Sequence, residues 1–106
     1  MPEKSARRLK LEESLAAQPD DTFLRYGLAL QCLREGDVAE GRTRLHALID
    51  DHPDEVAAYQ QLGQSYLESQ EHDAAKQVLA TGLEKAQRAG QAHAAAEIAG
   101  LLEFTL

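Results

Sequence analysis

The sequence is poor in several residue types, and each shortage excludes a class of protein. A single cysteine among 106 residues cannot form an internal disulfide bond, which fits a reducing cytoplasm. No apolar run approaches the length that crosses a bilayer, and the N-terminus lacks the apolar segment of a secretory signal. Valine, isoleucine and aromatic residues are scarce, whereas alanine, leucine, glutamate and glutamine are abundant, which favours helices over strands. We therefore expect a cytoplasmic, all-α protein with a single domain over residues 1–106 and no membrane partner.

The distribution of charge argues against nucleic acid as a partner. The formal net charge is −7 at pH 7, and residues 19–73 hold twelve acidic residues against four arginines. Such a surface repels phosphate backbones, and we interpret it as a solvated helical surface. A small basic run near the N-terminus is interpreted as a solvated helix end; its members are Lys4, Arg7, Arg8 and Lys10.

The sequence repeats with a period of 34 residues. Pro19-Asp20-Asp21 returns as Pro53-Asp54-Glu55, and apolar or small residues follow at the same spacing. The matched pairs are Leu28 and Leu62, Ala29 and Gly63, Cys32 and Tyr66, Gly36 and Gln70, Gly41 and Ala75, Leu45 and Leu79, and Leu48 and Gly82. A fixed period in this range indicates copies of one supersecondary unit stacked in a row.

Apolar spacing and helix-breaking residues divide the chain into about six helices. Proline ends the helix before it at Pro19 and Pro53, and glycine closes a helix at Gly36 and Gly90. Short loops make successive helices antiparallel. The predicted segments are an N-terminal helix (3–18), a first repeat (20–53), a second repeat (54–89) and a C-terminal capping helix (91–104).

Residues within these segments resemble the tetratricopeptide repeat. Residues 56–83 carry its pattern in Tyr59, Leu62-Gly63, Tyr66, Ala75 and Leu79. Residues 22–53 match more loosely, because Arg25 stands where the family has a large apolar residue and Gly41 where it prefers alanine. The resemblance implies a right-handed superhelical stack of antiparallel helix hairpins. The N-terminal helix would then be the second half of a degraded repeat.

The resemblance also implies a function as a protein–protein interaction module, an adaptor or scaffold. Such arrays bind a peptide or partner segment in a concave groove lined by the first helix of each hairpin. The groove positions here are Phe23, Tyr26, Leu30 and Arg34 in the first repeat, and Gln60, Gln61, Gln64 and Glu68 in the second. Phe23 and Leu30 could instead pack against the N-terminal helix. One subfamily clamps a C-terminal carboxylate with basic groove residues; Tyr26, Leu30 and Gln61 replace them here, so that ligand is not expected.

The C-terminal helix motivates an alternative from another class, a structural unit that assembles with itself. A capping helix should present a polar outer face, yet this one ends in apolar residues. We expect Ile98, Phe104 and Leu106 to form an exposed patch, through which two copies would pair as a homodimer.

Catalytic and metal-binding patterns are not evident. None of the four histidines, His46, His52, His72 and His93, has another at the spacing of a helical metal pair. Cys32 falls on an inward stripe, which predicts a buried and inert thiol. We therefore expect no enzyme activity, no metal and no cofactor. The identity of the partner is not readable from the sequence.

Overall fold

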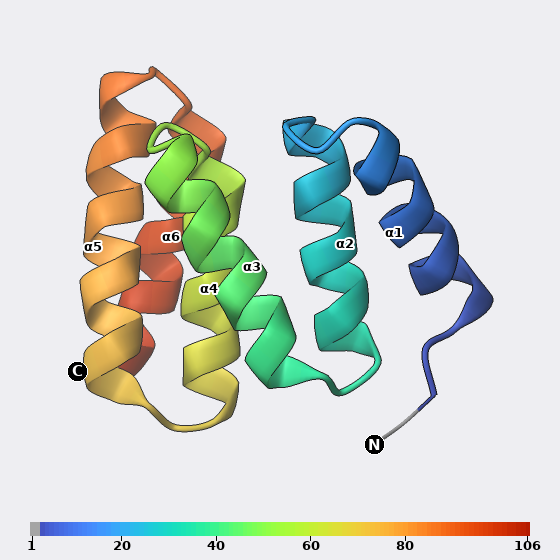
Figure 1. Ribbon diagram of the computed structural model, residues 1–106. Coiled ribbons are helices and arrows are strands. Elements are labelled where there is room, and N and C mark those ends of the chain that lie inside the picture. Colours follow the sequence, from blue (N-terminus) through green and yellow to red (C-terminus); the bar gives the residue numbers. More distant parts are fainter. Residues whose placement is uncertain (1–2) are drawn as a thin grey trace. The chain divides into compact units, whose positions relative to one another are not determined.

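The computed structural model describes residues 3–106, and these residues form helices with no strand among them (Figure 1). The elements are α1 (Ala6–Ala17), α2 (Thr22–Arg34), α3 (Val38–Asp51), α4 (Val56–Glu68), α5 (His72–Arg88), α6 (Ala92–Leu102) and the short 3₁₀ helix η1 (Glu103–Thr105). The predicted all-α helical repeat fold is confirmed.

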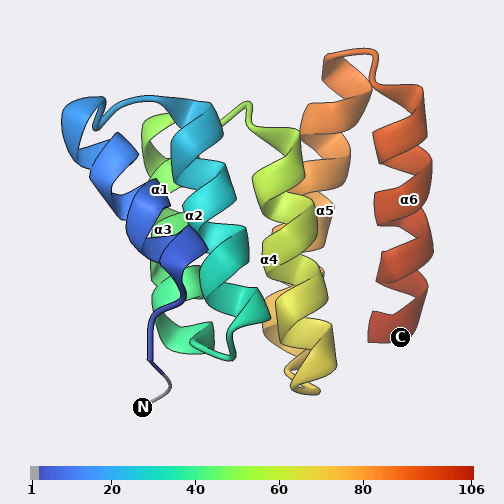
Figure 2. The same ribbon diagram turned by 90° about the vertical axis from the view of Figure 1, so that its right-hand side faces the viewer.

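The described residues group into two compact units, one ending at Asp51 and the other beginning at His52. The first unit contains α1, α2 and α3, and the second contains α4, α5, α6 and η1. Within each unit, successive helices run antiparallel (Figures 1 and 2). The organisation of residues 1–106 as a single domain stays a prediction.

Helix starts in the first unit are fixed by side-chain caps. The Ser5 hydroxyl accepts a hydrogen bond from the Arg8 amide, so α1 begins at Ala6, later than predicted. The Asp21 carboxylate accepts from the Leu24 amide at 2.9 Å and starts α2. At α3, Asp37 Oδ1 accepts a hydrogen bond from the amide of Glu40 at 3.4 Å and caps the start of the helix.

Three helices end in the same backbone motif, and only two of them use glycine for it. Gly36 and Gly90 adopt positive φ angles of 85° and 70°, as predicted. Gln70, the repeat counterpart of Gly36, adopts a φ of 61°. In each case the next residue donates its amide to a carbonyl five residues earlier, for example from Glu71 to Tyr66 at 2.9 Å. A glutamine therefore occupies a position that favours glycine.

The core of the first unit lies between α2 and α3, where the buried residues are Leu28, Ala29, Cys32, Leu45 and Leu48. The burial of Cys32 confirms the predicted inward thiol, and burial raises its pKa. Gly41 allows α3 to approach α2 closely. A Cβ atom there would lie 2.6 Å from Leu33 Cδ2 and 3.2 Å from the Ala29 carbonyl oxygen. This contact explains why glycine replaces the expected alanine.

The second unit packs α5 between α4 and α6. Small residues again set the spacing, because a Cβ atom at Gly63 would meet the Leu79 side chain and one at Gly82 would lie 2.6 Å from Tyr59 Cβ. Ile98 of α6 packs into the same core and is 0% exposed. Its predicted place in an exposed C-terminal patch is therefore wrong. The apolar stripe of α6 turns toward α5, and Ile98 lies on that stripe.

Candidate partner-binding surfaces

One face of α2 carries four predicted groove residues, which we call the α2 surface: Phe23, Tyr26, Leu30 and Arg34. Their spacing of three, four and four residues places them on one stripe of the helix. Phe23 is 81% exposed and Arg34 is exposed, whereas Tyr26 and Leu30 are half-buried. The alternative that Phe23 packs against α1 is therefore wrong.

The packing of α2 explains why this stripe faces outward. Leu28, Ala29 and Cys32 lie on the opposite side of the helix and are buried, so they fix its rotation within the first unit. Phe23 is 81% exposed, so most of its apolar surface stays in water after folding. A partner that covers this surface would gain the free energy of burying it. The α2 surface is thus an apolar patch with a cationic end at Arg34.

One face of α4 carries the other four predicted groove residues, which we call the α4 surface: Gln60, Gln61, Gln64 and Glu68. Gln64 and Glu68 are exposed, and Gln60 and Gln61 are half-buried. The opposite face of α4 holds Leu62 and Gly63 against α5. Each glutamine amide both donates and accepts hydrogen bonds, so this surface suits a polar ligand such as a peptide backbone. A continuous groove that includes both surfaces stays a prediction, because they belong to different units.

A buried arginine is the main feature that sequence reasoning missed. Arg8 of α1 is 2% exposed, which overturns its interpretation as part of a solvated helix end. Its Nη2 atom lies 3.0 Å from Asp37 Oδ2 and 2.9 Å from Glu40 Oε2, and both are hydrogen bonds. The guanidinium also forms longer ion pairs with Glu35 at 3.8 Å and Glu12 at 3.6 Å. We call Arg8 and these four carboxylates the Arg8 cluster.

Hydrogen bonds favour the charged forms of Arg8 and Glu35. Burial opposes the Arg8 charge, but the hydrogen bonds to Asp37 and Glu40 outweigh it and raise the pKa of Arg8. Glu35 accepts hydrogen bonds from the Ser5 hydroxyl and from Gln31, which lower its pKa.

Glu40 has a lowered pKa for a similar reason. It accepts a bond from Arg44 Nε at 3.1 Å and another from Arg8, and these outweigh the opposing effect of its partial burial. The cluster joins α1 to the turn between α2 and α3. Its sequence signal was the i, i+4 spacing of Arg8 and Glu12, which by itself also fits an exposed pair.

The part of the chain that the structure describes contains no group of three or more histidine, cysteine, aspartate or glutamate side chains arranged to hold a metal ion. No helix within residues 3–106 combines the length and the apolar character needed to cross a membrane.

Comparison with known proteins agrees with the repeat geometry. The sequence profile of the tetratricopeptide repeat matches residues 32–98, which is more than half of the chain. The chain belongs to the tetratricopeptide repeat family. Proteins of this family are in general protein–protein interaction modules, and that general role extends to this chain. No curated protein sequence matches the chain.

Solved structures include similar tetratricopeptide repeat proteins. A crystal structure of a tetratricopeptide repeat domain protein from Salinibacter ruber is 27% identical, with a TM-score of 0.75 over 80% of this chain and 96% of the other. A solution NMR structure of such a domain from the same organism is 28% identical, with a TM-score of 0.77 over 82% of this chain and 88% of the other. The solution structure of a protein from Bordetella parapertussis is 25% identical, with a TM-score of 0.82 over 95% of this chain and 88% of the other.

Proposed function

We propose that this tetratricopeptide repeat protein is an adaptor that binds a segment of another protein through its α2 and α4 surfaces. The observation that carries the proposal is the exposure of Phe23 at 81% on the α2 surface. Exposed aromatic residues that a fold does not need are typical anchors of protein interfaces. The expected ligand is a peptide segment with an apolar side chain that covers Phe23.

The polar part of the ligand is expected on the α4 surface. The glutamine amides there can pair with the backbone of an extended segment, and Glu68 favours a basic residue beside it. The net charge of −7 favours approach of a partner with a basic segment. Two kinds of contact, apolar on α2 and polar on α4, would then define the specificity.

The test is affinity capture from a cell lysate with the wild type, Phe23→Ala and Gln64→Ala. Both substitutions remove exposed side chains, so the helix content measured by circular dichroism should not change. A partner that the wild type captures should be lost from Phe23→Ala and weakened by Gln64→Ala. The matched control is Leu9→Ala, which removes an apolar side chain from a 51% exposed position on α1. Equal capture by Phe23→Ala and wild type would refute binding through the α2 surface.

A second candidate function is self-assembly through the C-terminal end of the chain. Phe104 and Leu106 are 68% and 99% exposed, and the Phe104 carbonyl oxygen lies 3.0 Å from His72 Nδ1 at the start of α5. This contact holds the backbone of η1 against the start of α5. Ile98 has no part in this surface because it is buried. Phe104 and Leu106 would instead form the contact between two copies.

A further inference from the structure

Within the first unit, α1 and α2 run antiparallel and in contact along one side (Figures 1 and 2). At one end of this contact the Ser5 amide donates a hydrogen bond to Glu35 Oε1 at 3.4 Å. Near its middle Leu11 faces Gly27, since a Cβ atom at Gly27 would lie 3.9 Å from Leu11 Cδ2. We call this line of contact, with Leu11 and Gly27 at its centre, the α1–α2 seam.

The α1 side of the seam is basic. Arg7 stands four residues before Leu11, so the two share one stripe of α1, and with Lys10 and Ser14 they line a hollow of about 180 Å³. Arg7 and Lys10 are exposed. Neither side chain forms an ion pair or a hydrogen bond with another group in residues 3–106.

The α2 side of the seam adjoins the α2 surface. Phe23 stands four residues before Gly27, and Leu30 and Arg34 stand three and seven residues after it, so all share one stripe of α2. Arg34 is exposed and has no ion pair in the part of the chain that the structure describes. No residue of α2 is acidic. The stripe is therefore apolar and ends in a cation.

Arg7 and Arg34 belong to the same end of the seam. Arg7 follows Ser5 by two residues and Arg34 directly precedes Glu35, and Ser5 and Glu35 are joined by a hydrogen bond. Lys10 lies about one helical turn from Arg7. We call these three basic residues the seam cations: Arg7, Lys10 and Arg34.

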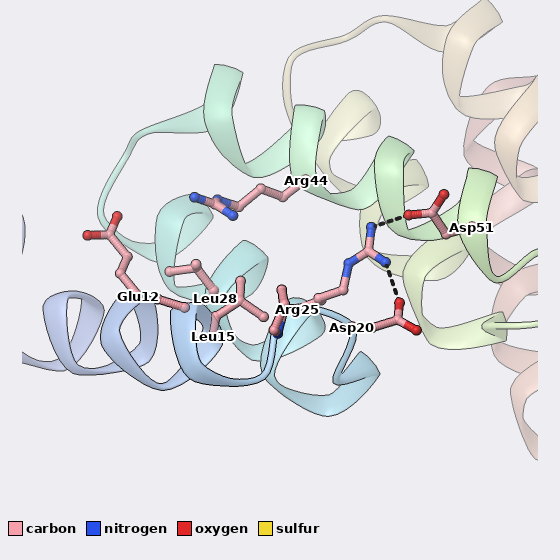
Figure 3. A pocket seen from close by; sticks show the side chains of 9 residues that line it. Glu12, Leu15, Asp20, Arg25, Leu28, Arg44 and Asp51 are labelled. Atoms are coloured by element: carbon pink, nitrogen blue, oxygen red, sulfur yellow. Dashed lines mark ion pairs between the residues drawn. The ribbon is translucent and has the colours of Figure 1, made fainter.

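The basic residues on the other side of α2 are neutralised within the first unit. Arg25 forms ion pairs of 3.5 Å with Asp20 and 2.8 Å with Asp51 (Figure 3). Arg44 of α3 pairs with Glu40 at 3.1 Å. The seam thus carries positive charge that the unit does not neutralise, in a chain whose net charge is −7.

We propose that the α2 surface and the seam cations together bind an acidic segment of another protein. This inference rests on the proposed function, since it assigns a charge to the segment whose apolar side chain covers Phe23. The net charge of the chain acts at long range, but charges more than about 8 Å away are largely screened at physiological salt. In contact the nearest groups decide, and arginine binds carboxylates through paired hydrogen bonds. A basic part of the partner would then belong at Glu68 on the α4 surface.

The first test compares three blocked peptides of equal length by NMR titration. Each has a central leucine, and its flanking residues are all glutamate, all glutamine or all lysine. We expect the glutamate peptide to give saturable shift changes at the amides of Leu11, Gly27 and Leu30, with a dissociation constant on the order of 1 mM. The lysine peptide should bind roughly fivefold more weakly, with the glutamine peptide between them. No saturable change at these amides, or equal binding of the glutamate and lysine peptides, would overturn the inference.

Charge reversal tests whether the seam cations make the contact. Arg34→Glu and, as a second variant, Arg7→Glu should each weaken binding of the glutamate peptide by roughly threefold and strengthen that of the lysine peptide. Lys76→Glu is the matched control, because it reverses an exposed cation on α5 in the second unit. It should leave both affinities unchanged. An equal effect of all three variants would show that the peptides sense only net charge, which would contradict a site at the seam.

A pair of substitutions at Gly27 tests the seam without removing a cation. Glutamate and glutamine have similar size and helix propensity, and the 3.9 Å distance to Leu11 leaves room for a Cβ atom. Gly27→Glu supplies a carboxylate to the seam from within the chain. It should therefore weaken binding of the glutamate peptide more than Gly27→Gln does. Equal binding by the two variants would count against recognition of a carboxylate there.

Affinity capture from a lysate separates failure of this inference from failure of the proposed function. A partner with an acidic segment that is lost from both Phe23→Ala and Arg34→Glu would support both. A partner lost from Phe23→Ala but kept by Arg34→Glu would leave binding through the α2 surface intact and overturn the acidic segment. A partner kept by Phe23→Ala would refute the α2 surface and the acidic segment with it.

Discussion

At the scale of one residue, the two repeats differ in the residue that holds a positive φ at the end of their first helix. Gln70 holds a φ of 61° at the end of α4, where its repeat counterpart Gly36 holds a φ of 85°. A residue with a Cβ atom loses about 1 kcal/mol or more in the left-handed region, and glycine does not. The backbone hydrogen bonds from Gln70 and Glu71 to α4 maintain this conformation despite that loss.

We predict that Gln70→Gly raises the free energy of unfolding by about 0.5–1 kcal/mol, because it relieves the left-handed strain. The mirror substitution Gly36→Gln should lower the free energy of unfolding by a similar amount, because no atom lies near enough to Gly36 to add another effect. Urea denaturation followed by circular dichroism measures both. Destabilisation by Gln70→Gly would show that the glutamine side chain has a stabilising contact.

Arg8 has the largest predicted single-residue effect on stability. Arg8→Ala leaves Asp37 and Glu40 close together without their shared cation, and we expect a loss on the order of 2–4 kcal/mol at pH 7. The loss should be smaller at pH 3, because Glu40 without the hydrogen bond from Arg8 takes up a proton more readily as the pH falls. Denaturation curves at the two pH values measure the difference. An equal loss at both would show that Arg8 acts by packing alone.

At the scale of elements, the docking of α1 should depend on pH. The folded-state pKa values of Glu35 and Glu40 lie below their ordinary value of 4.5. Their contribution to stability is therefore complete above about pH 4.5 and is lost as the pH falls through the lowered pKa values. We predict that the hydrogen-exchange protection factors of α1 fall below pH 4.5 before those of α5 do. Simultaneous loss of protection in both helices would argue against a local effect.

The close packing of α4 against α5 depends on Gly63, as that of α2 against α3 depends on Gly41. Gly63→Ala places a Cβ atom against Leu79 in the core, and we predict a loss of about 1–3 kcal/mol in the free energy of unfolding despite the better helix propensity of alanine. Gly100→Ala is the matched control, because no atom within 4 Å opposes a Cβ atom there. It should stabilise α6 by about 0.5–1 kcal/mol. Thermal unfolding of the two variants should shift in opposite directions.

At the scale of the whole molecule, self-assembly separates the two candidate functions. If Phe104 forms a contact between copies, the wild type should be a dimer at high micromolar concentration and Phe104→Asp a monomer, because a buried charge without a partner opposes association. Size-exclusion chromatography with light scattering measures both masses. A monomeric wild type would remove self-assembly and leave the adaptor proposal as the remaining candidate.

The helices and the repeat follow from signals within the amino-acid sequence. The period of 34 residues, Pro19, Pro53 and the turn at Gly36 are local or periodic signals, and such signals act through backbone conformation and apolar spacing along one helix. They predicted the all-α repeat fold, and the burial of Leu28 and Cys32 followed from the same spacing.

Which charged and apolar side chains are buried depends instead on packing between helices. Arg8 meets Asp37 and Glu40 some thirty residues later in the chain, and Ile98 turns toward α5 because of how α6 packs. The ion pair of 2.8 Å between Arg25 and Asp51 likewise joins residues that no local pattern relates. Periodicity identifies the faces of a helix, but the partner of each face is chosen by packing between elements distant in sequence.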